Sequence, residues 1–221
     1  ALYLNNTYRR PVIGWEHEIE ALDHEAIINF YRRWYAPNNA ILVVAGDVTA
    51  DELRPLAEKY YGSIARADTP ERTRPTEPPQ RAERRVTYYD ERVRQPSWQQ
   101  IYLAPSYVSG ETKHAYALEV LSDILGGGAT SRLYRSMVIE NKLAVGSGAY
   151  YSPDRLGPGV FGLYASPRPG VSMEDVESAI AAEIEKIMMG GVTQDEVARS
   201  VRSMKASAIY ARDSLTTGAR V

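Results

Sequence analysis

A proline-rich polar stretch at residues 66–85 divides this sequence into two parts. Four prolines lie in it: Pro70, Pro75, Pro78 and Pro79. The other residues are mostly Arg, Glu and Thr, with almost no apolar side chains to bury. Proline cannot donate the backbone hydrogen bond that helices and sheets need. We therefore predict an extended surface linker between two domains, residues 1–65 and 86–221, each with its own core.

The first part carries helix and strand signals in a clear order. Asp23 precedes apolar residues at helical spacing, so we predict a helix with Asp23 as its N-cap. The run Ile41–Ala45 is wholly apolar, which predicts a short buried strand. Thr49 and Glu52 have the spacing of a capping box, in which each side chain bonds the other residue's backbone amide. A second helix is therefore expected after Thr49.

The second part repeats such signals. Alternating or apolar runs predict strands at residues 86–89, 99–104, 145–151 and 160–166. Helical spacing predicts helices over residues 114–125 and 131–143, and two more after Ser172 and Thr193. Asp175 gives the first of these two a variant capping box, and Glu196 gives the second a regular one.

A strand, a turn, a capping box and an amphipathic helix occur in this order on both sides of the linker, at residues 41–61 and 160–188. The repetition suggests two related domains. Paired helices between strands, with one antiparallel strand pair, argue against a doubly wound parallel sheet. The predicted fold class is therefore α+β, with two homologous domains in which helices pack on an antiparallel-rich sheet. We expect the first domain to be truncated, and the second to be truncated at its C-terminus.

Composition excludes several classes of function. The formal net charge is −2, which gives no electrostatic basis for nucleic-acid binding. The chain has no Cys, so disulfides, thiolate metal sites and cysteine nucleophiles are excluded. No apolar stretch approaches the roughly 18 residues that a membrane helix needs. The sequence begins at Ala1 without Met, so a missing signal sequence leaves the compartment open between periplasm and cytoplasm.

The aromatic content is dominated by tyrosine, with 16 Tyr against 2 Phe and 3 Trp. Tyrosine is apolar with a polar tip, so it suits half-buried positions. Two explanations stay open: a sheet with one face toward water, or a binding groove.

The three histidines do not form a recognisable metal motif. His17 and His24 lie among acidic residues, but an N-cap at Asp23 places His17 outside the helix that contains His24. A solvated acidic helix entrance explains them better than a metal site does. His114 lies at the start of another helix. We therefore predict no metal ligands and no catalytic residues in this chain.

The run Gly126–Gly127–Gly128 precedes a helix, with Ser131 and Arg132 at its start. Exposed amides there could contact an anion or a peptide, although the Lys of a phosphate-binding loop is missing. A hinge or a close approach of two backbone segments explains the glycines equally well.

Several segments together resemble one protein family. They are Tyr8–Trp15, Phe30–Ala40, Val43–Val48, Leu121–Tyr134 and Glu140–Ala144. In this order they are similar to the insulinase-type zinc metallopeptidases, which include the mitochondrial processing peptidases and their bacterial relatives. The match covers essentially the whole chain, from the end of the first peptidase domain through most of the second.

The resemblance implies a zinc-dependent endopeptidase that cleaves peptides inside a chamber formed with a second subunit of the same family. In that family an H-x-x-E-H motif and a later Glu bind the zinc, and all of them would precede Ala1. This chain would then be non-catalytic and hold no cofactor, with zinc bound elsewhere in the parent protein. The resemblance also makes Gly126, Gly127, Gly128, Ser131 and Arg132 candidates for a loop that faces the substrate.

The sequence departs from the family at two positions. The family's substrate-holding Arg and Tyr would align with Val138 and Val145. Their absence suggests that the parent is the zinc-bearing partner of a pair, a homo- or heterodimer. The alternative is a catalytically inactive assembly subunit of the same fold.

Overall fold

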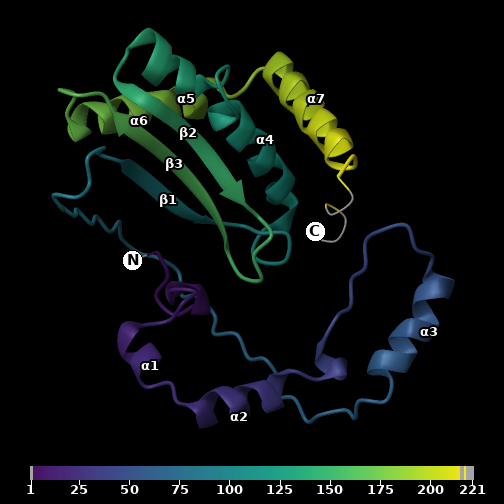
Figure 1. Ribbon diagram of the computed structural model, residues 1–221. Helices are drawn as coiled ribbons and strands as arrows, with labels where there is room; N and C mark the ends of the chain where they lie inside the picture. Colours follow the sequence, from purple (N-terminus) through teal and green to yellow (C-terminus); the bar gives the residue numbers. More distant parts are fainter. Residues whose placement is uncertain (1, 215–216, 218–221) are drawn as a thin grey trace. The chain divides into compact units, whose positions relative to one another are not determined.

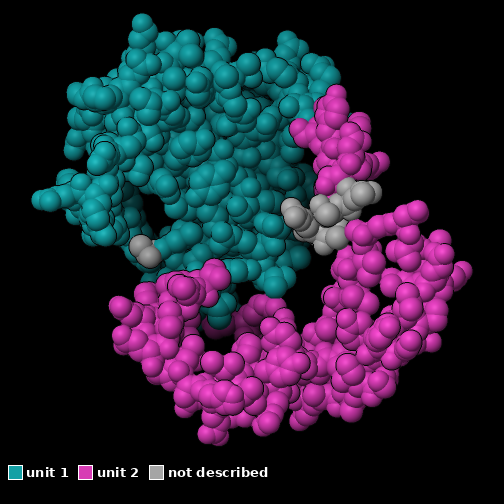
Figure 2. Space-filling model, in the orientation of Figure 1, with its two compact units in different colours: residues 1–9, 76–205 teal, residues 10–75, 206–221 magenta. Residues whose placement is uncertain are grey.

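The protein is described by a computed structural model that covers residues 2–214 and 217. The chain forms two units, shown in different colours in Figure 2: residues 1–9 with 76–205, and residues 10–75 with 206–221. The chain passes from one unit to the other between residues 75 and 76, inside the predicted linker. The predicted domain limits themselves stay a prediction.

The unit that contains residues 76–205 is built on a three-stranded antiparallel sheet. Its strands are β1 (Trp98–Ala104), β2 (Ala144–Ser152) and β3 (Gly159–Pro167), in the spatial order β1-β3-β2. In the register, Leu163 of β3 lies opposite both Gln100 of β1 and Ala149 of β2. Strands β2 and β3 are consecutive and pair as a hairpin. The strands predicted at residues 99–104, 145–151 and 160–166 are thus confirmed.

Helices cover one face of this sheet (Figure 1). They are α4 (Ala115–Gly126), α5 (Arg132–Tyr134), the π-helix η4 (Arg135–Glu140) and α6 (Met173–Gly190), with the short 3-10 helix η3 (Thr112–His114) before α4. The core between helices and sheet includes Leu125, Leu133, Met137, Leu163 and Ile180, all at most 2% exposed. Burial of several such side chains, at roughly 1.5–3 kcal/mol each, supplies the main stabilisation of this unit.

The last long helix, α7 (Gln194–Ala211), is packed against the end of α4 through its first turns. It begins as the sequence predicts. Thr193 Oγ1 accepts from the amide of Glu196, and the Glu196 carboxylate accepts from the amide of Thr193. At the start of α6, Ser172 accepts from the amide of Asp175. The shorter Asp175 side chain bonds the Ser172 hydroxyl instead of completing the capping box.

Residues 10–75 form helices with little core. They include α1 (Glu16–Glu20), α2 (His24–Trp34), the 3-10 helix η2 (Pro37–Asn39) and α3 (Ala50–Tyr61). A further 3-10 helix, η1 (Thr7–Arg9), belongs to the other unit. Asp23 caps α2 and Thr49 with Glu52 forms a capping box on α3, as predicted. Every residue of α1, α2 and α3, all of which the structure describes, is at least partly exposed.

Two predicted strands are not formed. Residues 41–45 are extended but unpaired, and Ile41 is 92% exposed. Residues 86–89 are also irregular and exposed. A strand is stable only when a neighbour satisfies its backbone groups, and neither segment has a pairing strand in the described part of the chain. An apolar pattern indicates what a segment can bury, but not whether a partner is there.

The α+β fold class is confirmed, with antiparallel pairing throughout the sheet. Among the described residues, no helix combines the length and the apolar character that a bilayer span requires.

Candidate functional site

The glycine run joins the end of α4 to the start of α5, and each glycine has its own environment. A Cβ on Gly126 would lie 1.8 Å from the backbone nitrogen of Ala149, so the end of α4 touches the backbone of β2. A Cβ on Gly127 would lie 2.1 Å from Asp123 Oδ1 and 2.6 Å from the backbone carbonyl oxygen of Asp123. Close backbone approach therefore explains these two glycines, one of the alternatives left open by the sequence.

Gly128 differs from the other two. Its φ is +106°, in a region that favours glycine, and an added Cβ would meet nothing within 4 Å. The loop from Gly127 to Thr130 is exposed, whereas Ser131 is 3% exposed. Of the five predicted substrate-facing residues, Gly127 and Gly128 thus lie on an exposed loop, while Ser131 is buried. Their contact with a substrate stays a prediction.

Arg132, the fifth of these residues, is held by the start of α7. Its Nε and Nη2 donate to the two carboxylate oxygens of Glu196, both at 2.7 Å, and Nη2 also donates to the carbonyl of Gly191 at 3.2 Å. Both side chains are less than a quarter exposed. A two-pronged pair of this kind has strong directional preference, so it fixes α7 against α5.

The same pair perturbs both ionisable groups. The hydrogen bond from Arg132 lowers the pKa of Glu196 to about 2, and the Thr193 amide and hydroxyl act in the same direction. The hydrogen bond with Glu196 raises the pKa of Arg132. Glu196 therefore stays ionised far below neutral pH.

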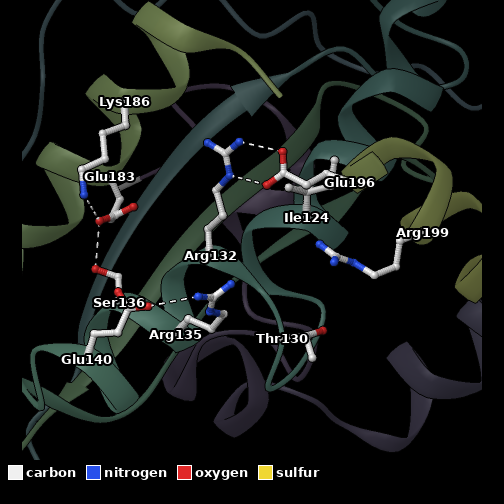
Figure 3. A pocket seen from close by; sticks show the side chains of 10 residues that line it. All are labelled: Ile124, Thr130, Arg132, Arg135, Ser136, Glu140, Glu183, Lys186, Glu196 and Arg199. Carbon is white, nitrogen blue, oxygen red and sulfur yellow. Dashed lines mark hydrogen bonds and ion pairs between the residues drawn. The ribbon is translucent and has the colours of Figure 1, made fainter. Parts of the chain in front are cut away.

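A pocket with a volume of about 160 Å³ opens beside this ion pair (Figure 3). It is lined by residues of α4, α5, η4, α6 and α7 and by Thr130 of the loop before α5, and most of these residues are charged. Three of its acids have basic or hydroxyl partners: Glu196 with Arg132, Glu140 with Arg135 at 3.2 Å, and Glu183 with Lys186 at 2.6 Å and Ser136 at 2.9 Å. A segment of π-helix, which supplies Arg135, Ser136 and Glu140, is rare and often found at functional sites.

A smaller cavity of about 70 Å³ adjoins the pocket and shares Ile124, Thr130, Glu196 and Arg199 with it. Ser131 also lines this cavity, and its Oγ is the buried side-chain oxygen without a hydrogen-bond partner among the described residues. Ser131 occupies the N-cap position of α5, yet its hydroxyl does not cap the helix. A buried hydroxyl without a partner costs about 1–3 kcal/mol, so this atom calls for an explanation.

The sheet face opposite the helices carries a pair of tyrosines. Tyr150 on β2 lies over Gly162 of β3, and Tyr164 on β3 lies over Gly148 of β2; each glycine is the direct cross-strand neighbour of its tyrosine. Both rings remain more than a third exposed. They favour the first explanation of the high tyrosine content, a sheet with one face toward water, and they give that face a flat aromatic surface.

The three histidines lie on three different secondary-structure elements. His17 lies within α1, His24 is the first residue of α2, and His114 ends η3 in the other unit. Among the described residues, no three His, Asp or Glu side chains are grouped so that they could hold a metal ion. The described residues of this chain therefore do not fit the zinc site that the family resemblance implies for the parent protein.

Sequence comparison decides the family. The sequence model of the Peptidase M16 inactive domain matches residues 21–204. This chain belongs to the M16 family. The insulinase-type resemblance is thereby confirmed, and the matched portion is the domain that the family describes as inactive.

Curated relatives of this M16 chain are bacterial. Zinc protease PqqE of Helicobacter pylori is 30% identical over 213 residues, which cover 94% of this chain and 46% of PqqE. The uncharacterized zinc protease SCO5738 of Streptomyces coelicolor is 29% identical over 213 residues, with 94% and 45% covered. The chain thus spans about half the length of the curated relatives it matches.

Two solved structures have the fold of this M16 chain. A protease from Helicobacter pylori superposes with a TM-score of 0.86 at 27% identity, over 99% of this chain and 52% of that one. The peptidase M16 inactive domain from Pseudomonas fluorescens gives a TM-score of 0.74 at 19% identity, over 93% and 48%. The second likeness concerns the fold alone.

Sequence analysis did not predict that Glu196 binds Arg132, or that Arg199 lines the pocket next to the glycine loop. Glu196 was visible only as a capping residue, and Arg132 lies 64 positions away from it. Val138 and Val145, where the family's substrate-holding Arg and Tyr would align, are respectively 8% and 51% exposed. Neither side chain can replace the hydrogen bonds of an Arg or a Tyr.

Proposed function

We propose that this chain is the non-catalytic portion of a zinc-dependent endopeptidase, where it forms part of the wall of a peptide-binding chamber. The observation that carries the proposal is the match to the M16 inactive domain over residues 21–204, in a chain whose described residues hold no metal-ligand cluster. Relatives that are named zinc proteases and are about twice as long support a zinc site elsewhere in the parent protein.

The exposed apolar surface of residues 10–75 supports a larger parent domain. Ile41, Leu42 and Val43 are all more than half exposed, and the helices around them bury no residue fully. Exposed apolar surface of this extent usually marks an interface or a missing core partner. In the proposal, the zinc-bearing portion of the parent supplies the strands that pair with residues 41–45.

The proposed role of the inactive domain is to bind and orient the peptide. Zinc would be held by the other portion of the parent, where it activates the water that attacks the peptide bond. The helix-free sheet face offers the rings of Tyr150 and Tyr164 to a peptide. The loop at Gly127 and Gly128 is exposed, but the amides of these two glycines already donate to the carbonyls of Asp123 and Gly126. A second M16 subunit would close the chamber as a homo- or heterodimer.

The full-length parent tests this proposal. We expect one zinc per active site by metal analysis, and cleavage of an unfolded peptide that stops when a chelator removes the metal. Deleting the second domain should reduce kcat/KM by at least about 100-fold, because correct placement of the peptide contributes several kcal/mol to catalysis. Equal cleavage with and without this domain would contradict the proposal. A stable heteromer without zinc or cleavage would instead favour the inactive assembly subunit.

A further inference from the structure

The pocket beside the glycine loop contains one basic side chain that has no ion-pair partner among the described residues. Arg199 of α7 lines both the larger pocket and the smaller cavity, and it has no ion-pair partner among the described residues. Figure 3 shows its side chain extending from α7 toward the middle of the pocket, between Arg132 and Thr130. Arg132, Arg135 and Lys186 each have an acid partner. Arg199 is therefore the basic group of this pocket that is free to bind a ligand.

Ser131 provides an independent observation at the same place. Ser131 lines the smaller cavity with Arg199, and its Oγ is buried and has no hydrogen-bond partner in the described part of the chain. A ligand oxygen in this space would lie close to the Arg199 side chain and to the residue whose hydroxyl lacks a partner. The larger pocket, at about 160 Å³, far exceeds the 10–15 Å³ or so that one water needs, and Thr130 in its lining is exposed.

We propose that this pocket binds a carboxylate group, with Arg199 as its main ligand and the hydroxyls of Thr130 and Ser131 as further donors. Guanidinium and carboxylate match in shape and charge. The acids around the pocket, including Asp123 in the smaller cavity, disfavour a doubly charged anion such as phosphate. The site therefore selects a singly charged carboxylate, either from a peptide's C-terminus or from a free carboxylic acid. This binding does not require the proposed peptidase activity.

Isothermal titration of the full chain with three probes tests the site. The probes are an acetylated tripeptide with a free C-terminal carboxylate, the same tripeptide as its amide, and acetate. We expect the carboxylate peptide to bind at least about tenfold more tightly than the amide, because a charge-assisted hydrogen bond is lost in the amide. Acetate that binds as tightly as the peptide would identify a free carboxylate as the source; much weaker acetate binding would identify the peptide terminus.

Two variants separate this role from a structural one. Arg199→Gln should weaken binding of the carboxylate peptide at least about tenfold, whereas Arg202→Gln, the same charge change on the same helix outside the pocket, should leave it unchanged. Ser131→Ala should weaken binding without lowering the urea midpoint of unfolding, because it removes a hydroxyl that has no partner in the ligand-free protein. Equal binding of carboxylate and amide, or equal losses in Arg199→Gln and Arg202→Gln, would overturn the proposal.

Discussion

Replacing Gly126 by alanine is expected to lower the free energy of unfolding by about 3 kcal/mol or more. The added Cβ would lie 1.8 Å from the nitrogen and 2.6 Å from the oxygen of Ala149, and both are backbone atoms of β2. Backbone in a paired strand cannot move aside as a flexible side chain can, and overpacking of cores commonly costs about 1–3 kcal/mol, sometimes more. Chemical denaturation followed by circular dichroism measures the change.

Gly190→Ala is the matched control for this substitution. Gly190 ends α6, and an added Cβ there would meet nothing within 4 Å. Alanine favours a helix over glycine by up to about 1 kcal/mol, so this variant should be unchanged or slightly more stable. If Gly126→Ala were as stable as Gly190→Ala, the close approach of α4 to β2 would be wrong.

Replacing Glu196 by glutamine is expected to cost about 2–3 kcal/mol at pH 7. The change removes the charge that pairs with Arg132 in a setting where both side chains are mostly buried. It leaves a partly buried guanidinium without its anion, which is the costly way to break such a pair. The lowered pKa of Glu196 has the same sign, because its main cause is the hydrogen bond from Arg132 to the ionised carboxylate.

The cost of Glu196→Gln should depend on pH in a defined window. The folded-state pKa lies below the unfolded value, so the ionised carboxylate stabilises the folded state fully above about pH 4.5. This stabilisation is lost as the pH falls from about 4.5 toward 2. The difference between wild type and Glu196→Gln should therefore shrink across that window, as measured by urea denaturation at several pH values.

Glu185→Gln serves as the control for the charge change alone. Glu185 is exposed on α6, so its replacement should change stability by less than about 0.5 kcal/mol at any of these pH values. A cost of Glu196→Gln that stayed the same from pH 7 to pH 2 would contradict stabilisation of the folded state by the Glu196 carboxylate charge.

Local signals in the sequence predicted the helices well, and they did so for a physical reason. The caps at Asp23, Thr49 and Thr193 involve residues within three positions of one another, so the whole interaction is visible in a short stretch. The hairpin of β2 and β3 is similarly local. Residues 41–45 and 86–89 were predicted wrongly because a strand depends on a partner that its own sequence does not contain.

The candidate site was only partly accessible to sequence analysis. The glycine run marked the right loop, but contact with Ala149 explains Gly126 and a positive φ explains Gly128, and neither can be read from composition. The pairing of Arg132 with Glu196 joins residues 64 positions apart. The π-helix at Arg135–Glu140 has no recognised sequence signal, and the isolated hydroxyl of Ser131 appears only once its neighbours are placed.

Zinc analysis of the purified 221-residue chain, together with an assay for peptide cleavage, tests the central claim most directly. We predict less than stoichiometric zinc after dialysis and no cleavage, because His17, His24 and His114 lie on separate elements and no group of acids or histidines among the described residues could complete a site. One tightly bound zinc per chain, lost in His17→Ala or His24→Ala along with zinc-dependent cleavage, would contradict the account.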